Sequence, residues 1–358
     1  MTKVRFAVIG AGWISQEAFL PAVHQTSNAE VTAIVSGDAR KARQLADFHG
    51  IKSIYDYSRF DEMAKSGEVD AIYVATPNSS HCEYTVRAAA HGLHAMVEKP
   101  LAVSVAESEA MIAAAEKAGV YLMTAYRLHN DPATIKLVEI LQSGAIGDVR
   151  HFSSVFTFPV SAGNHRLKAS HWGGPLQDVG VYCLNAARHV FGDNPVRVSA
   201  AASFGHEDPR FTEVEEGVAV TMEFPRGRLA QFYAGFGTDT MDMYQAIGTK
   251  GSITLWNGFR FGVPRRMVIQ HAEAQEVIDF DVVDNFSGMI DYFADCIIKK
   301  RPPLGDGVEG LADMQAMLAI EASSRSGRTV DMPRLAAFKS YDTAMARSYP
   351  PAKHRLLV

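Results

Sequence analysis

The chain has 358 residues, more than one ordinary hydrophobic core uses, so two domains are expected. Hydrophobic residues make up 47% and charged residues 21%, which is the composition of a folded globular protein and excludes a disordered or fibrous one. A net charge of -5 excludes the basic surface that nonspecific binding of nucleic acid requires.

The first part of the chain, from residue 4 to about 127, alternates short runs rich in Val and Ile with amphipathic stretches of helical length. This alternation predicts repeated βα units and a parallel sheet. The apolar runs are nearly continuous, which indicates strands covered by helices on both faces. The predicted strands are residues 5–9, 31–35, 70–75, 94–98 and 120–125, with a weaker one at 53–55.

After about residue 128 the pattern changes to a mixture of helices and successive strands. Helices are predicted at residues 132–143, 174–191, 285–299 and 308–325. Strands are predicted at 149–158, 196–204, 218–224, 228–236, 243–247, 252–256 and 267–271, with a hairpin turn at Pro225-Arg226-Gly227. The sequence therefore predicts an α/β chain in which a Rossmann domain with a doubly wound parallel sheet, residues 1–128, precedes an α+β domain with a mainly antiparallel sheet, residues 129–358.

The cysteines and the first residues indicate the compartment. Cys82, Cys183 and Cys296 are too few and too far apart for a disulfide framework or a zinc motif, so we expect no metal. The residues before Gly10 lack the apolar segment of a signal peptide, and no run approaches the roughly 20 residues that span a bilayer. We expect a cytoplasmic protein with no membrane or nucleic-acid partner.

The turn Gly10-Ala11-Gly12-Trp13-Ile14-Ser15 directly follows the first predicted strand and opens the first predicted helix. In this context a glycine-rich turn binds the pyrophosphate of a dinucleotide. Gly10 would permit the tight turn, and Gly12 would let the pyrophosphate approach the helix N-terminus. The alternative is a turn with a purely structural role.

The end of the second predicted strand distinguishes the two nicotinamide dinucleotides. A carboxylate there binds a free ribose 2′-hydroxyl and repels a 2′-phosphate. Here Ser36 and Gly37 follow the strand, and the acid Asp38 comes two residues later than such a carboxylate would. Two cations, Arg40 and Lys41, come after it. This favours NADP over NAD. The alternative is that the two cations are merely solvated and that Asp38 caps the next helix.

Two more polar segments follow predicted strands, at the sheet edge where ligands of open α/β sheets bind. One contains Thr76, Pro77, Asn78 and His81, and the other is Glu98-Lys99-Pro100. A surface ion pair is the plain alternative for Glu98 and Lys99, but their shared edge with the glycine turn favours a place in the cofactor site.

The order of motifs resembles that of the Gfo/Idh/MocA family of sugar and polyol oxidoreductases, most closely glucose–fructose oxidoreductase and its aldose-oxidising relatives. The resemblance runs from about residue 4 to about 331 and rests on GxGxx, VSGxAxKA, YDYSxF, TPNSxH, EKP, YRxHxDP and GGxxxDxGxYxxN. It implies that an open-faced antiparallel sheet covers the nicotinamide and offers both the sugar site and the interface of a homo-oligomer, either a dimer or a tetramer.

The resemblance also implies site residues. The expected cofactor-binding positions are Gly10, Gly12, Trp13, Ile14, Ser36, Gly37, Arg40, Lys41, Thr76, Pro77, Asn78, His81, Glu98, Lys99 and Arg127. In relatives the bond before the proline of EKP is often cis, so we expect a cis bond before Pro100.

The second predicted domain contributes the reactive pair of the DxGxY motif, Asp178 and Tyr182. Oxidation of a sugar carbinol requires a base beside the carbon that loses hydride. Tyr182 is the expected base, and the ammonium of Lys99 would favour its phenolate or hydrogen-bond the reacting oxygen. Asp178 would share a helix face with Tyr182 and orient the sugar. The alternative is an aspartate in the first turn and a half-buried core tyrosine.

The loop before this motif contains His165, His171 and Trp172, whose donors and aromatic face suit a pyranose; surface residues without a ligand are the alternative. We expect an NADP-dependent aldose oxidoreductase that forms a lactone at C1, with a tightly held cofactor recycled by a second sugar. The alternatives are a dissociable NAD(P)-dependent xylose or dihydrodiol dehydrogenase and a non-catalytic protein that senses NADP. Residues 333–358 are assigned only as a packing arm.

Overall fold

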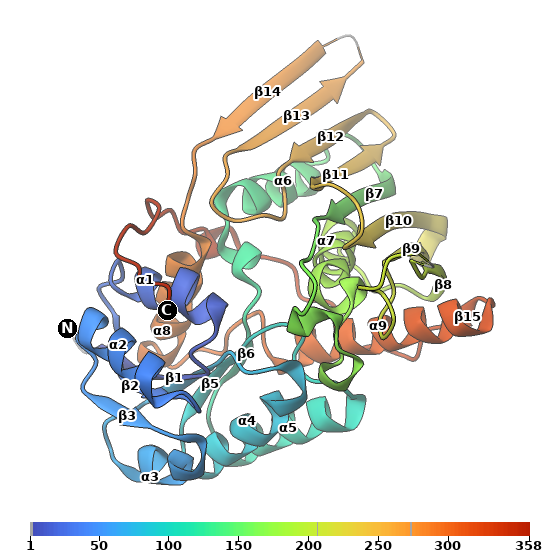
Figure 1. The fold of residues 1–358 in the computed structure, drawn as a ribbon. Helices are drawn as coiled ribbons and strands as arrows, with labels where there is room; N and C mark the ends of the chain where they lie inside the picture. The colour runs from blue at the N-terminus through green and yellow to red at the C-terminus, as the bar shows by residue number, and fades with distance from the viewer. Residues whose placement is uncertain (1–2, 206, 273) are drawn as a thin grey trace. The chain divides into compact units, whose positions relative to one another are not determined.

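The computed structural model describes residues 3–205, 207–272 and 274–358, and within them the chain divides into two compact units (Figure 1). The first unit comprises Met1–Asp131, Val283–Leu311 and Ala346–Val358, and the second comprises Pro132–Val282 and Ala312–Met345. The predicted functional division at residue 128 stays a prediction. Two segments from late in the chain, 283–311 and 346–358, belong to the same unit as the N-terminal sheet. Helix α8 (Asn285–Ile298), in the first of them, packs against β1 (Val4–Ile9) and β2 (Ala29–Val35) of that sheet.

The described part of the first unit contains a six-stranded parallel sheet with the order β3-β2-β1-β4-β5-β6. This is the order of a dinucleotide-binding sheet, and it reverses between β1 and β4, where such sheets bind their ligand. All six predicted strands are confirmed. Their bounds are β1 Val4–Ile9, β2 Ala29–Val35, β3 Ser53–Tyr55, β4 Ala71–Val74, β5 His94–Val97 and β6 Leu122–Thr124.

Helices cover both faces of this sheet, which explains why its central strands lack alternation. Phe6, Val8, Ile72 and Tyr73 are fully buried. The ring of Tyr73 stacks on that of Phe19 at 3.8 Å, which fixes the first helical segment on the sheet. The helical segments are η1 Ser15–Phe19, α1 Leu20–Val23, α2 Ala39–His49, α3 Phe60–Lys65, α4 His81–Ala90 and α5 Val105–Ala118, with η4 Arg127–Asn130 after β6.

The second unit contains, among its described residues, a nine-stranded sheet with the order β14-β13-β12-β11-β7-β10-β9-β8-β15. Its neighbours are antiparallel except β7 and β10. The predicted strands and the 225–227 hairpin are confirmed, whereas β14 and β15 were not predicted. The bounds are β7 Val149–Thr157, β8 Arg197–Ser203, β9 Gly217–Phe224, β10 Arg228–Gly235, β11 Met241–Gly248, β12 Gly251–Trp256, β13 Arg265–His271, β14 Ala274–Phe280 and β15 Val330–Asp331.

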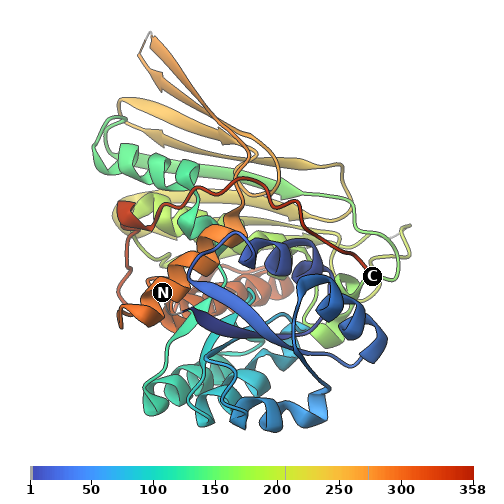
Figure 2. The ribbon, with the colours of Figure 1, turned by 90° about the vertical axis from the view of Figure 1, so that its left-hand side faces the viewer.

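The nine-stranded sheet is covered on one face. Helices α6 (Pro132–Gln142) and α7 (Val181–Phe191) lie on the same face of it (Figure 2). On the strands, buried and exposed residues alternate, and Leu229, Ile247 and Trp256 are exposed. This confirms the expected fold class, with an open-faced antiparallel sheet. Helix α9 spans Gly307–Ser326. Of the helices in the described ranges, none is both long and apolar enough to cross a membrane.

Candidate active site

The glycine turn follows β1 and lies beside the end of the neighbouring parallel strand β4. Gly10 has a φ of +100°, and a methyl group on its Cα would lie 2.7 Å from the carbonyl oxygen of Ala75. Only glycine fits both the backbone angle and this close approach. The buried hydroxyl of Ser15 donates to the carbonyl oxygen of Gly10 at 2.6 Å. Ser15, which replaces the usual third glycine, therefore closes the turn.

The next glycine lies in open space. A methyl group on Gly12 would meet only the carbonyl oxygen of Ala75, at 4.0 Å. The helical segment after it has no side-chain cap, and Trp13 is 51% exposed. Backbone N–H groups at an uncapped helix start attract anions. The turn therefore has room and backbone N–H groups for a pyrophosphate, and the cofactor-binding roles of Gly10 and Gly12 stay predictions.

The start of α2 carries the residues expected to select the dinucleotide. Asp38 is the N-cap: its carboxylate accepts a hydrogen bond from the backbone N–H of Lys41 at 2.9 Å, which lowers the pKa of Asp38. The Ser36 hydroxyl accepts from the N–H of Asp38 at 3.2 Å. The capping alternative for Asp38 is thus confirmed. Asp38 is thus used locally and Arg40 is exposed, while the roles of Ser36, Arg40 and Lys41 at a 2′-phosphate stay predictions.

His81 connects the two loops that follow β4 and β5. The side chain is fully buried, with Nδ1 3.0 Å from the carbonyl oxygen of Pro100 and Nε2 3.1 Å from that of Thr76. Burial lowers the pKa of this imidazole. His81 therefore contacts both loops from inside the protein, and its predicted place in the cofactor site stays a prediction. The bond between Lys99 and Pro100 is cis, as the resemblance implies.

Glu98 and Lys99 lie at the carboxyl end of β5, next to the strand that contacts the glycine turn. The phenol of Tyr73 on β4 donates to Glu98 Oε1 at 2.6 Å. Burial raises the pKa of the Glu98 carboxyl, whereas the charges of Lys99 and Arg127 lower it. Glu98, Lys99 and Arg127 therefore lie near enough to one another to interact electrostatically, at the edge where a bound nicotinamide is expected.

Arg127 is held from a distant part of the chain. Its guanidinium is buried and donates to Asn285 Oδ1 at 3.3 Å, and the amide of Asn285 donates to Asp131 Oδ2 at 2.7 Å. Sequence reasoning missed both Tyr73 and Asn285. A tyrosine inside an otherwise aliphatic strand is a signal for the first, but nothing links residues 127 and 285 before the chain folds.

In the second unit Tyr182 lies in the first turn of α7 and is partly exposed. The edge of its ring packs against Phe156 at 5.7 Å between centroids, and Phe259 lies 6.3 Å away. Aromatic packing of this kind fixes the direction of the phenol without using its oxygen.

Asp178 lies one turn earlier, in the π-helical segment η7 (Leu176–Gly180). The helix predicted over 174–191 is thus helical in the structure, and its first part is a π-helical segment, which the sequence did not predict. The guanidinium of Arg166 donates to Asp178 Oδ2 at 2.7 Å. The sequence did not predict this partner of Asp178. The ion pair ties the 165–172 loop to the proposed substrate carboxylate.

Two glycines hold the same loop against η7. A methyl group on Gly173 would lie 2.3 Å from the carbonyl oxygen of Arg166, and Gly174 has a φ of +125°. His165 is exposed at the start of the loop. The indole of Trp172 donates to Glu321 at 2.8 Å, so its orientation is fixed within the second unit. The sugar-binding roles of His165 and Trp172 stay predictions.

Comparisons with known proteins agree with both units. Residues 4–126 match the oxidoreductase family model with the NAD-binding Rossmann fold, and residues 134–254 match the GFO/IDH/MocA C-terminal domain model. A D-xylose 1-dehydrogenase (NADP(+)) of Haloferax volcanii is 30% identical, covering 91% of this chain and 99% of that protein.

Solved structures extend the similarity to the fold. The aldose-aldose oxidoreductase of Caulobacter crescentus, complexed with glycerol, has a TM-score of 0.88 at 33% identity, with 92% of this chain and 100% of that chain covered. A 3-ketoreductase from Actinomadura kijaniata, in complex with NADP and TDP-benzene, has a TM-score of 0.83 at 26% identity, with 90% and 98% covered.

Proposed function

The chain belongs to the GFO/IDH/MocA family of oxidoreductases, and on that basis we propose that it oxidises an aldose at C1 to the lactone, with NADP as hydride acceptor. The observation that carries the proposal is the place of Glu98 and Lys99 after the end of β5, at the same edge of the parallel sheet as the glycine turn that follows β1. The relatives support the substrate class, since two of them are named for reactions of xylose and of aldoses.

NADP fits the residues that are present. The uncapped helix start after Gly12 would hold the pyrophosphate, and Ser36, Arg40 and Lys41 would bind the 2′-phosphate. When bound, NADP supplies the nicotinamide ring whose C4 accepts the hydride. The relatives named for NADP, or solved with it, support this choice.

Three residues of the chain would remove the proton, stabilise the developing charge and orient the sugar. Tyr182, as the phenolate, takes the C1 hydroxyl proton while the C1–H bond breaks, so that the carbon becomes a carbonyl. Lys99 stabilises the phenolate and the reacting oxygen with its positive charge. Asp178, held by Arg166, accepts a hydrogen bond from a sugar hydroxyl and orients the ring.

A second candidate is a dissociable xylose dehydrogenase, which the similarity to the Haloferax enzyme favours. The two candidates differ in whether the cofactor leaves between turnovers. The test is the absorbance of the purified protein in the reduced-nicotinamide band, before and after a panel of aldoses is added with NADP or NAD. Retained cofactor that aldoses reduce supports recycling. An empty protein that turns over only with added NADP supports the dehydrogenase, and no reduction under any condition contradicts both.

The loop ion pair gives a prediction for substrate binding. Arg166→Met is expected to raise the KM for the aldose about tenfold with a smaller change in kcat, because Asp178 loses the donor that orients it. Steady-state kinetics check this. Lys168→Met is the matched control. Lys168 belongs to the same loop as Arg166, and the substitution removes its exposed ion pair with Glu213. Equal KM values for the two variants would contradict the positioning role.

We also propose that the open face of the second sheet forms a homo-oligomer interface, in a cytoplasmic protein. Its exposed apolar side chains, such as Leu229, Ile247 and Trp256, support this. Analytical ultracentrifugation at several concentrations distinguishes a monomer from a dimer or tetramer.

A further inference from the structure

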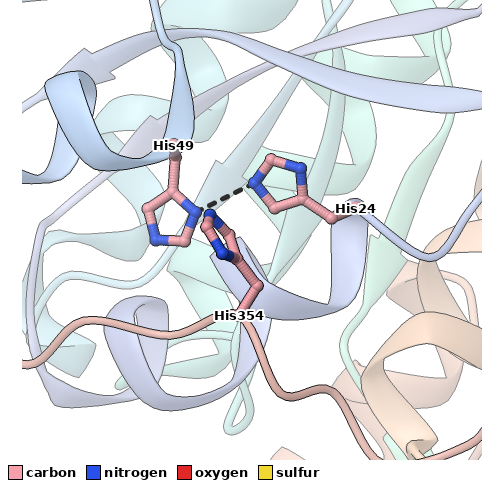
Figure 3. A group of neighbouring side chains, drawn as sticks. All are labelled: His24, His49 and His354. Carbon is pink, nitrogen blue, oxygen red and sulfur yellow. Dashed lines mark hydrogen bonds between the residues drawn. The ribbon is translucent and has the colours of Figure 1, made fainter.

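Three histidines of the first unit converge away from the glycine turn (Figure 3). His24 directly follows α1, His49 is the last residue of α2, and His354 belongs to the C-terminal segment. One ring nitrogen of each lies within 4.8 Å of those of the other two. The proposed oxidation of sugars uses none of them. Their spacing along the chain follows no metal-binding motif, which is why the sequence predicts no metal.

The ring geometry suits coordination of one ion. His24 Nε2 and His49 Nδ1 are 2.9 Å apart. In a tetrahedral site with bonds of about 2.0–2.1 Å to nitrogen, ligand nitrogens are about 3.4 Å apart, so this pair needs to open by only about 0.5 Å. The His354 ring stands at 87° to the ring of His24 and at 89° to that of His49. The third imidazole therefore approaches from a separate direction instead of stacking on the pair.

The donor chemistry selects the class of ion. All three ligands are imidazoles, which suit Zn²⁺, Co²⁺, Ni²⁺ and Cu²⁺ better than the oxygen-seeking Mg²⁺ and Ca²⁺. His49 is 8% exposed, whereas His24 and His354 are exposed, so the cluster has one buried ligand and two that an ion can reach from the surface. Of the cations near the cluster, Arg355 is paired with Glu17, and the charge of Lys3 acts on His24.

The cluster would connect the C-terminal segment to α1 and α2, which follow the segments predicted to bind the nucleotide. The backbone N–H of Val358 donates to Gln16 Oε1 at 2.7 Å, so the end of the chain already contacts the first helical segment. The His354 ring stacks on Phe48 of α2 at 4.3 Å. These contacts of the C-terminal segment lie on the surface. A metal ion bound by the three imidazoles would add a strong link between this segment and the two helices.

We propose that His24, His49 and His354 bind one divalent transition-metal ion of the Zn²⁺ class, with solvent as a further ligand. The ion fastens the C-terminal segment to α1 and α2, a structural role that is independent of the proposed sugar oxidation.

The test is a titration of the chelator-treated full chain with Co²⁺, whose visible absorption reports tetrahedral coordination. We expect saturation at about one ion per chain. His354 lies in the exposed C-terminal segment, so His354→Ala should leave the fold intact. The same substitution should lower the Co²⁺ affinity about tenfold or more. His24→Gln should do the same, whereas the control His271→Ala, in β13 of the second unit, should bind as the wild type does. Absence of the band, or equal affinity of His354→Ala and wild type, would overturn the site.

Trypsin cleavage provides a second readout that does not depend on activity. Zn²⁺ is expected to slow cleavage after Lys353 and Arg355 about tenfold in the wild type, because the bound ion holds the segment against α2. The same addition should not protect the His354→Ala variant. Equal cleavage rates of the wild type with and without Zn²⁺ would overturn the proposed fastening of the segment.

Discussion

Replacing Tyr182 by phenylalanine is expected to lower kcat for aldose oxidation roughly a hundredfold. The ring stays in its place against Phe156, so the fold loses little, and the only atom removed is the oxygen that would take the sugar proton. The affinity for NADP and the melting temperature should stay close to those of the wild type. Steady-state kinetics, a fluorescence titration with NADPH and a thermal melt measure the three quantities.

The control for this variant comes from the same aromatic cluster. Tyr244 is buried, and its ring lies 5.1 Å from that of Phe259, which is also a neighbour of Tyr182. Tyr244→Phe removes a phenol from this cluster without removing the proposed base, so its kcat should change far less. Wild-type turnover in the Tyr182→Phe variant would exclude this residue as the base.

Gly10→Ala is expected to destabilise the first unit and to abolish measurable NADP binding. An alanine with a φ of +100° costs at least about 1–2 kcal/mol. The added methyl group also lies 2.7 Å from a backbone carbonyl that cannot move without shifting the end of β4. A thermal melt should show a lower melting temperature, and calorimetric titration should show no binding.

Gly12→Ala separates stability from binding. Its methyl group would point into open space, with the nearest atom 4.0 Å away. The melting temperature should therefore stay near the wild-type value, whereas the affinity for NADP should fall about tenfold or more, because the methyl group occupies the approach of the pyrophosphate. If both variants bound NADP as the wild type does, the turn would not be the nucleotide site.

The fold could be predicted where burial leaves a strong pattern. The six strands of the parallel sheet read as apolar runs because helices cover both of their faces. Strand β14 was missed because its residues are largely exposed and alternate weakly. The π-helical turn before α7 was missed because backbone hydrogen-bond spacing leaves no mark in the sequence.

The candidate site could be predicted for residues within motifs but not for their partners. Gly10, Ser36 and Glu98 follow strands directly, so their place at the sheet edge follows from the order of the chain. The partners Asn285 for Arg127 and Arg166 for Asp178 depend on tertiary packing. His81 lies within the TPNSxH motif, but the motif did not predict its contacts. The buried ring lies between the carbonyl oxygens of Pro100 and Thr76 and so connects two loops.

The measurement that tests the central claim most directly is a double-mutant cycle in kcat/KM with Lys99→Met and Tyr182→Phe. If ammonium and phenol act on the same sugar oxygen, the double variant should be about as slow as the slower single variant, because either change disables the shared step. Losses that multiply across the two substitutions would show that these groups act separately, and the proposed convergence on C1 would be wrong.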